Sequence, residues 1–448
     1  MNTTQEINPN QVYRDFLSSP RLQENQGEAA WLVEIRERAY ERFQTLGFPT
    51  RKNEAWKYMN VDSVLNAPFT PADELKHAHI QDASEIRPLF LSDQQARMVF
   101  IDGIFSKELS ETKNLPQGAI LKSLKESLVD HEDLIRQHIA KHVLTEPDTL
   151  ALANTFAFSD GIFFFLPKGY TLEQPIHFLF ADTAGKTSSV THLRFLIVME
   201  EKTRAEIVFQ RTAPKHSEIL MNIVCEIDAG RQAKLAWNTI EQNASQLLAT
   251  RAYLEEGSAF EMVSINENSA VDRNETYVYF KGKNASCSLS GLSVLSGNSG
   301  SHYLATVHHK APECTSRQFY KNILAGEAKS EFTSLVHVYP DAQKSDSNQL
   351  NRNLLLSDKA RAYARPQLKI DADDVKATHG AATGYLDENE LFYLQSRGLN
   401  LELARLVLIF GFAEEVLQLI KLPILKEQLR ASIRSKLETM IQKRENKL

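Results

Sequence analysis

The repeated phrases EEKTRAEIVF (200–209), DAGRQAKLAW (228–237), EEGSAFEMVS (255–264) and GKNASCSLSG (282–291) each join a turn to a strand-like run. They place Ala205, Ala233, Ala259 and Ala285 at intervals of 28, 26 and 26 residues. A recurrence in the twenties, with apolar residues alternating along each run, is typical of a β-solenoid whose coils stack on one another. This region is therefore predicted to form a parallel β-helix, with a small residue where each coil turns.

A looser form of the pattern continues toward the C-terminus. AGEAKSEFTS (325–334) and SDKARAYARP (357–366) carry Ala328 and Ala360, at wider intervals of 43 and 32 residues, which we interpret as inserted loops. A β-sandwich would show turn signals without a fixed period. The alternation predicts that Ile207, Leu235 and Val263 point into the solenoid.

Helices are expected on both sides of the solenoid. Apolar residues recur at three- and four-residue steps within 28–46, and again beyond Pro423, where Leu425, Leu429, Ile433, Leu437 and Ile441 share one face. Asp387 and Asn400 are predicted helix caps, with Gly398 ending the first of the two helices. The predicted organisation is a mostly helical region 1–150, a β-helix 151–378 and a helical domain 379–448. His379 stands at the last junction, between turns marked by Gly380 and Gly384.

Composition narrows the function classes. The 448-residue chain carries a formal net charge of −6, which gives no electrostatic footprint for nucleic acid. It lacks an N-terminal targeting pattern and a run of eighteen apolar residues, so a cytoplasmic protein without a membrane segment is expected. Cys225, Cys287 and Cys314 are few and widely spaced, which predicts reduced thiols.

Catalytic motifs are absent from the sequence. There is no phosphate-binding glycine loop with Lys-Ser/Thr, no HExxH and no GxSxG, so an autonomous enzyme is not predicted. The pairs His138/His142 and His308/His309 each lack a full ligand set nearby, and packing or surface roles are favoured for both.

Five segments carry a family resemblance. They are KNEAWKY (52–58), NLLLSDKARAYARP (353–366), PQLKIDADDV (366–375), HGAATGYLDENELFYLQSRGL (379–399) and GFAEEVL (411–417). With them the chain resembles the SufB/SufD family, the scaffold subunits of the SUF system of iron–sulfur cluster assembly. The resemblance implies a right-handed parallel β-helix core and a C-terminal helical domain that docks the ABC-type ATPase SufC. It also implies a SufB–SufD pair formed through the solenoid ends, with a transient cluster at their interface.

Within that family the chain is more similar to SufD than to SufB. It reads His379-Gly380-Ala381 where SufB-like chains typically carry His-Glu-Ala, and Asn351, Arg352 and Asn353 replace the cysteine expected before the LLLS strand. Ala377 stands where many SufD chains have a cysteine. The resemblance thus makes His379 the single candidate ligand, and it describes a non-catalytic accessory subunit.

Phe392, Tyr393 and Arg397 are the candidates for docking SufC, because aromatic and arginine side chains dominate interface hot spots. The family leaves open whether a reduced flavin binds the complex and whether the isolated chain forms a homodimer. The alternative function is a structural or binding β-solenoid with no cofactor role. A carbohydrate-active β-helix enzyme would need carboxylates clustered on one face of the solenoid.

Overall fold

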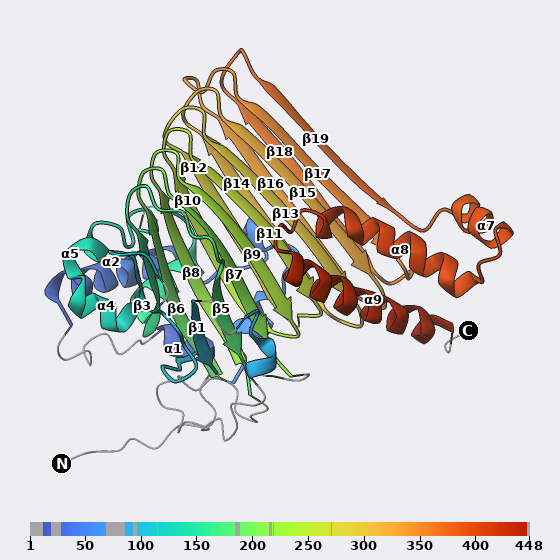
Figure 1. The fold of residues 1–448 in the computed structure, drawn as a ribbon, viewed down its shortest axis with the longest axis horizontal. Coiled ribbons are helices and arrows are strands. Elements are labelled where there is room, and N and C mark those ends of the chain that lie inside the picture. Colours follow the sequence, from blue (N-terminus) through green and yellow to red (C-terminus); the bar gives the residue numbers. More distant parts are fainter. Residues whose placement is uncertain are drawn as a thin grey trace.

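The structure is a computed structural model that describes residues 12–18, 28–68, 86–92, 96–113, 115–144, 146–183, 189–214, 217, 219–269 and 271–445. Its centre is a flattened parallel β-solenoid made of two facing sheets (Figure 1). Along most of the solenoid the chain alternates between the sheets, so a strand there pairs with the strand two places before it and the strand two places after it. The predicted parallel β-helix between helical regions is confirmed, and no sandwich topology is present in the described residues.

The two sheets are named here by their size in the described part of the chain. The ten-stranded sheet has the order β19 (Lys376–Gly384), β17 (Asp346–Leu355), β15 (Thr315–Leu324), β13 (Ser286–Leu295), β11 (Ala259–Glu267), β9 (Lys234–Gln242), β7 (Arg204–Thr212), β5 (Ile176–Ala181), β1 (Arg97–Ile101), β2 (Ile104–Phe105). The nine-stranded sheet has the order β18 (Arg361–Ile370), β16 (Lys329–Val338), β14 (Gly300–His309), β12 (Asp272–Phe280), β10 (Ser245–Leu254), β8 (Ile219–Ala229), β6 (Ser189–Met199), β4 (Asp160–Leu166), β3 (Ile120–Ser123).

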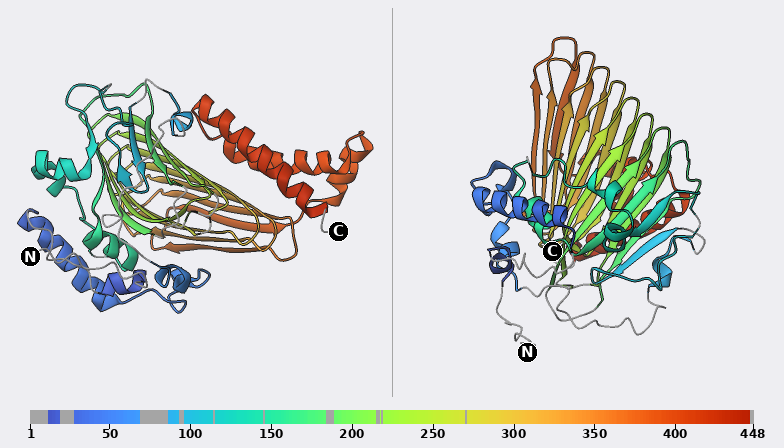
Figure 2. Two further views of the ribbon diagram at one scale, coloured as in Figure 1. Left: turned by 90° about the horizontal axis from the view of Figure 1, so that it is seen from below. Right: turned by 90° about the vertical axis from the view of Figure 1, so that its left-hand side faces the viewer.

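Helices cover the outer faces of both sheets (Figure 2). The N-terminal helices are α1 (Tyr13–Ser18), α2 (Ala30–Leu46), α3 (Val61–Leu65), α4 (Leu124–Asp130), α5 (Glu132–Arg136) and α6 (Thr149–Ala157). The C-terminal helices are α7 (Glu388–Ser396), α8 (Leu401–Leu417) and α9 (Pro423–Glu445). None of the helices in the described ranges is long and apolar enough to cross a membrane.

The coils turn on a column of small buried side chains. The column precedes the strands of the ten-stranded sheet and consists of Thr203, Ala233, Ser258, Ala285, Cys314 and Ser345. The residue before each member has a positive φ, and only one of these residues is a glycine; they are Lys202, Gln232, Gly257, Asn284, Glu313 and Lys344. A left-handed residue reverses the chain, and a small side chain then fits the tight interior of the corner.

The alanines of the sequence repeat were expected to mark the same corner in every coil, and only some of them do. Ala233 and Ala285 belong to the column, whereas Ala205 and Ala259 lie one or two residues inside their strands. Ala328 and Ala360 lie at the other edge of the solenoid, just before β16 and β18 of the nine-stranded sheet. The interval of 43 residues from Ala285 to Ala328 thus arises because the two alanines lie at opposite edges of the solenoid, and the prediction of an inserted loop was wrong.

Side chains alternate between the interior and the outer face. Ile207 and Leu235 are buried in the interior cluster, as predicted. Val263 points the other way, into a second apolar cluster shared with α8 and α9, so this prediction was wrong. Because helices cover its outer face, this sheet buries apolar residues on both sides, and alternation alone does not mark the inner side.

The strands extend beyond the bounds expected for the solenoid. β1 begins at Arg97 and β3 at Ile120, within the region expected to be mostly helical, and β19 continues to Gly384. The apolar run of β1 pairs in parallel with β5 and extends the sheet on that side. His379 consequently lies within a strand and not at a turn.

The helix signals near both termini were read correctly. α2 ends at Leu46 before Gly47, which has φ +72°. The Asp387 carboxylate accepts hydrogen bonds from the backbone N–H groups of Asn389 and Glu390, and the Asn400 side chain accepts from Leu403. The apolar residues predicted for one face of α9 are all buried against the solenoid or α8.

Candidate functional site at the open end of the solenoid

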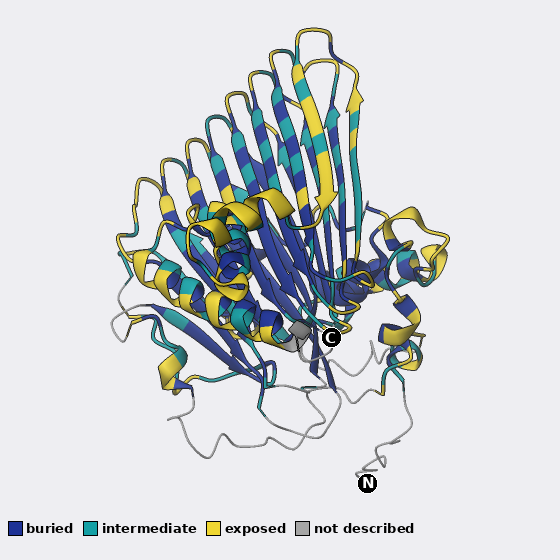
Figure 3. Cartoon of the chain, turned by 90° about the vertical axis from the view of Figure 1, so that its right-hand side faces the viewer, coloured by how far each residue is buried: buried dark blue, intermediate teal, exposed yellow. Residues whose placement is uncertain are grey.

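The solenoid ends in two neighbouring strands that have no further strand beside them. β18 is the last strand of the nine-stranded sheet and β19 the last of the ten-stranded sheet, within the part of the chain that the structure describes. Figure 3 shows this end as the least buried part of the solenoid, and most residues of β19 are exposed. We call β18 and β19 together the open end.

His379 lies on β19 in register with Gln349 of β17. Because Gln349 points into the solenoid, the imidazole of His379 also faces the interior, at its mouth. The His379 Nδ1 atom lies 3.1 Å from the carbonyl oxygen of Pro366 on β18. A carbonyl oxygen only accepts, so Nδ1 carries the proton and donates it. The neutral ring then keeps its lone pair on Nε2, to which no described residue is bonded.

This arrangement is that of an oriented single ligand. A histidine that binds a metal through Nε2 generally donates its other N–H to a carbonyl or carboxylate, which fixes the ring. The described residues, however, contain no group of three or more histidine, cysteine or carboxylate side chains that could hold a metal ion. Any iron bound at His379 would need its remaining ligands from outside the described residues.

The position expected for a cysteine in SufB-like chains is filled by hydrogen-bonded amides. Asn353 donates to the side chains of Asn351 and Thr383, at 2.7 and 3.0 Å. Asn322 donates to Asn353 in turn, at 2.7 Å. These amides satisfy one another across neighbouring coils, and they are much weaker iron ligands than a thiolate.

The three cysteines are free, as predicted, and all three are buried. They lie away from the open end, on β8, on β13 and just before β15. Burial raises the pKa of Cys314 to about 11 and raises the pKa of Cys225 and of Cys287 still further. The thiol and not the thiolate is the stable form at neutral pH, so none is prepared to bind iron or sulfide.

A distant part of the chain packs against the open end, which the sequence did not predict. Glu54 accepts from Arg365 of β18, with 2.9 Å between Oε1 and Nη1. Tyr58 stacks on Tyr363 of the same strand, with 4.1 Å between ring centroids. Segments 52–58 and 353–366, which both carry the family resemblance, are therefore neighbours in space.

Of the predicted docking residues, Phe392 and Tyr393 lie on α7 and Arg397 is its C-cap; α7 contacts α8 and has no buried residue. Phe392 is 73% exposed and Tyr393 is 58% exposed. The Arg397 guanidinium lies 5.7 Å from the Tyr393 ring centroid. Two aromatic rings and an arginine thus form an exposed patch, which we call the α7 patch. Figure 1 shows α7 beyond the end of β19, set apart from the solenoid.

The other candidate histidines have packing roles. His309 points inward and bonds the Ser316 hydroxyl at 2.8 Å, and burial lowers its pKa to about 4. His308 points outward and stacks on Tyr279. His138 contacts the Asp228 carboxylate at 2.5 Å, and His142 lies against the Tyr253 ring.

Comparison with known proteins agrees with this architecture. Residues 180–412 match the model of the SufBD core domain, described as SUF system FeS cluster assembly, and residues 7–178 match the SufBD protein N-terminal region. The chain belongs to the SufBD family. The core match begins at β5 and ends within α8, so it covers most of the solenoid, the open end and α7.

SufBD relatives resemble the chain over nearly its full length. An iron–sulfur cluster assembly SufBD family protein of Synechocystis is 30% identical over 421 residues, which cover 91% of each chain. The iron–sulfur cluster assembly protein SufD of Escherichia coli is 28% identical, covering 87% of this chain and 90% of its own. The iron–sulfur cluster assembly protein SufB of Bacillus subtilis is 25% identical, covering 86% of this chain and 85% of its own. The relatives therefore include both branches of the family.

Proposed function

We propose that this SufBD protein is a SufD-type, non-catalytic subunit of a SUF complex. In this proposal the open end pairs with a SufB-like paralogue, and the α7 patch docks a SufC-like ABC ATPase. An iron–sulfur cluster forms transiently at the interface between the two solenoids, as cargo of the complex. The observation that carries the proposal is His379, held by Pro366 in the mouth of the open end with Nε2 unbonded by any described residue.

The unpaired strands support a pairing function for this end. An edge strand presents a row of unsatisfied N–H and C=O groups, and proteins usually cover such an edge or blunt it with charge, proline or a bulge. β19 reads KATHGAATG, with one charged residue and no proline, and its small side chains leave the backbone accessible. β18 carries Pro366 and three basic residues, so its edge is less suited to pairing. A second solenoid end can continue the ten-stranded sheet by adding a strand beside β19.

The chemistry at the open end supports a SufD-type role. A single imidazole together with an asparagine ladder gives one good iron ligand and no thiolate, so a partner would have to contribute the sulfur ligands. Ala377, which is in register with Ser347, adds none. This division agrees with an accessory subunit beside a cysteine-bearing SufB-like partner.

The α7 patch supports a second interface. A nine-residue helix without any buried side chain gains little from packing in the isolated chain, while exposed aromatic and arginine side chains are enriched where partners bind. Deletion of 385–448 would be a poor test, because α8 and α9 bury Val263, Ile265 and Leu292. Substitutions confined to α7 avoid that damage.

The first experiment uses His379→Ala and His379→Asn in the co-expressed complex, scoring subunit stoichiometry and acid-labile sulfide together. Asparagine places an amide N–H near the position of Nδ1, so it can keep the bond to Pro366 without supplying an imidazole. The ligand role predicts an assembled complex with reduced sulfide for both variants. A structural role predicts that only alanine loses partner or sulfide, and normal sulfide in both variants would reject the ligand role.

The second experiment tests docking with Phe392→Ala/Tyr393→Ala, measured by affinity for the purified ATPase. We expect at least a 100-fold loss, with the thermal midpoint of the chain unchanged because neither ring is buried. Val129→Ala, at another exposed apolar residue, is the control. Full binding by the double variant would remove α7 from the interface.

The measurements of ATPase binding and acid-labile sulfide also distinguish the SUF role from the alternative function. A structural or binding solenoid with no cofactor role would show neither ATPase binding nor a sulfide phenotype. Reduced flavin in the complex and a homodimer of the isolated chain stay predictions. Absorbance of the purified complex and sedimentation of the isolated chain test them.

A further inference from the structure

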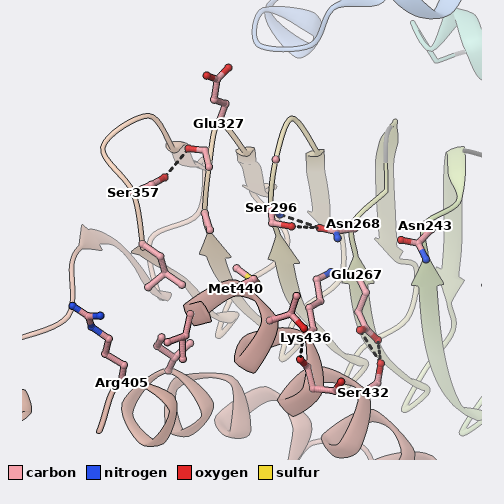
Figure 4. Close-up of a pocket in the computed structure, with 18 of the residues that line it drawn as sticks. Asn243, Glu267, Asn268, Ser296, Glu327, Ser357, Arg405, Ser432, Lys436 and Met440 are labelled. Carbon is pink, nitrogen blue, oxygen red and sulfur yellow. Dashed lines mark hydrogen bonds between the residues drawn. The ribbon is translucent and has the colours of Figure 1, made fainter. Parts of the chain in front are cut away.

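A large cavity separates α9 from one edge of the solenoid. Its volume is about 1500 Å³, and it runs along the turns that lead into the strands of the nine-stranded sheet. Figure 4 shows side chains from these turns and from α8 and α9 around it. Turn residues that line it are small or polar, among them Asn243, Asn268, Ser296, Gly297 and Gly326.

The α9 side of the cavity is also small and polar. Ser432, Ser435, Lys436 and Thr439 follow the three- and four-residue spacing of one helix face, and all four line the cavity. Elsewhere α9 packs with leucine and isoleucine. Three hydroxyl side chains on this stripe are too short to fill the space that larger apolar residues would fill.

Lys436 is the exceptional group in this cavity. Its Nζ atom is shielded from solvent and has no hydrogen-bond partner among the described residues. Burial lowers the pKa of Lys436 to about 7, and Glu267 opposes this shift. A buried ammonium group without a partner is costly, so an anion placed beside it would gain a strong interaction.

The remaining charges around the cavity are mostly engaged with one another. The Glu267 carboxylate accepts from Gln242 at 3.1 Å and from the Ser432 hydroxyl at 2.9 and 3.0 Å. Lys359 bonds Glu327 at 2.8 Å. Asp358 and, from α8, Arg405 complete the charged lining.

Charged and apolar side chains line the cavity together. Lys436, Ser432 and Glu267 lie near one another, and Arg405 lies on the other side of the cavity (Figure 4). The apolar lining residues are Leu356, Leu386, Ile409, Met440 and Ile441, and they belong to the cluster between the helices and the solenoid. A ligand with an anionic group and an apolar body would match this lining.

We propose that this cavity binds a small organic anion, with its phosphate or carboxylate on Lys436 and its body against the apolar lining residues. The ammonium supplies the charge, and the Ser435 hydroxyl is a hydrogen-bond donor on the same helix face, whereas the Thr439 hydroxyl donates to the backbone carbonyl of Ser435 at 3.0 Å. The proposal is independent of the SUF role, because neither His379 nor any residue of the α7 patch lines the cavity.

Pyridoxal 5′-phosphate is a suitable chemical probe, because it joins a phosphate to an aldehyde. The neutral Nζ attacks the aldehyde carbon and water leaves, and borohydride then reduces the imine to a stable secondary amine. At pH 7 we expect labelling at Lys436 at least ten-fold above that at exposed Lys421, measured by peptide mass spectrometry. Equal labelling of the two lysines would overturn the proposal.

Reversible ligands test the site without covalent chemistry. Phenyl phosphate and benzoate should protect Lys436 from the probe and raise the thermal midpoint of the wild type and of Lys421→Met, but not of Lys436→Met. Stronger protection by phenyl phosphate would indicate that the natural ligand carries a phosphate group. Stronger protection by benzoate would indicate that it carries a carboxylate group. Failure of both to protect would reject the site.

Binding should also depend on pH. Above pH 7 the empty site holds a neutral amine, so affinity should fall between pH 6.5 and 8.5. The facing charged groups are Glu267, Glu327, Asp358, Lys359 and Arg405. None is a histidine or cysteine, the types that ordinarily titrate near this window. Unchanged affinity across the window would contradict the role of Lys436.

Discussion

The two ends of the solenoid are built differently. At the N-terminal end, β2 and β3 pair antiparallel with β1 and β4, and the interior is filled by aromatic rings. Phe178 there has its ring centroid 6.2 Å from Phe195 and 6.0 Å from Trp237. Next to the open end the interior side chains of β17 are Gln349, Asn351 and Asn353, and β18 and β19 each have a strand on one side only in the described part of the chain.

This difference separates an end that terminates the sheets from one that can be continued. Apolar rings exclude water and need no hydrogen-bond partners, so the N-terminal end is complete in one chain. Amides and bare strand edges carry donors and acceptors that a second backbone can satisfy. The contrast predicts that substitutions at the N-terminal end affect folding, whereas those at the open end affect association.

The largest expected effect is on folding. Phe178→Ala should lower the free energy of unfolding by about 3–5 kcal/mol, because it leaves a cavity among packed rings. Leu368→Ala, whose half-buried side chain lies on β18, should cost less than about 2 kcal/mol. Urea denaturation of the isolated chain measures both. Equal losses would show that the two ends are packed alike.

The next effect concerns association. The backbone N–H of Lys376 donates to the carbonyl oxygen of Ser345, on the β17 side. In a parallel ladder the N–H groups alternate in direction, so those of the even-numbered residues of β19 point to β17 and that of Ala381 points away from it. Ala381→Pro removes an outward donor and keeps the inward ones. We expect at least a 100-fold weaker complex with the SufB-like partner, about 2.8 kcal/mol, with the thermal midpoint of the chain little changed.

Ala381→Val retains the N–H group and is the matched control. If the proline variant binds its partner as well as the valine variant does, the edge of β19 is not a pairing surface. Isothermal titration of each variant against the purified partner distinguishes these outcomes.

The third effect is a pH dependence that originates in the N-terminal half. Burial lowers the pKa of His177 on β5 to about 4, below its value in the unfolded chain. The unfolded state therefore binds more protons between about pH 6.5 and 4. The neutral, buried His177 therefore contributes fully to the free energy of unfolding above pH 6.5. This contribution is lost as the pH falls, and about 2 kcal/mol of it is gone at pH 5.

His177→Phe removes this titration while keeping a ring in the same position. The variant should show a smaller fall in the free energy of unfolding between pH 7.5 and pH 5 than the wild type, measured by urea denaturation at each pH. An unchanged fall would assign the acid sensitivity to other groups, such as His192, whose pKa burial lowers to about 3.

Much of the architecture could be predicted from local patterns. The recurring turn-and-strand phrases indicated a solenoid because stacked coils need the same reversal at each level. The caps Asp387 and Asn400 marked the starts of α7 and α8, since a side-chain oxygen there satisfies free backbone N–H groups. Each of these signals acts within a few residues, so it can be read without knowing the rest of the fold.

The sequence patterns did not predict β19, because this strand depends on a neighbour that is distant in the sequence. Alanine, glycine and threonine in KATHGAATG form no apolar alternation, and the strand exists because β17 offers a ladder of hydrogen bonds beside it. His379 could be singled out from its sequence, but its orientation could not. The bond to Pro366 joins two strands in different sheets, and only their stacking brings the two atoms together.

The sequence by itself determined the recurrence of the coils and the flanking helices, because these depend on residue type and spacing, and the family resemblance singled out His379. Only the tertiary structure decided which face of a strand is inside, as Val263 shows, and that 52–58 lies against β18. It alone revealed that Lys436 has no hydrogen-bond partner among the described residues. Burial and pairing depend on what lies across the fold, and residues far apart in the chain carry no local signal of their contact.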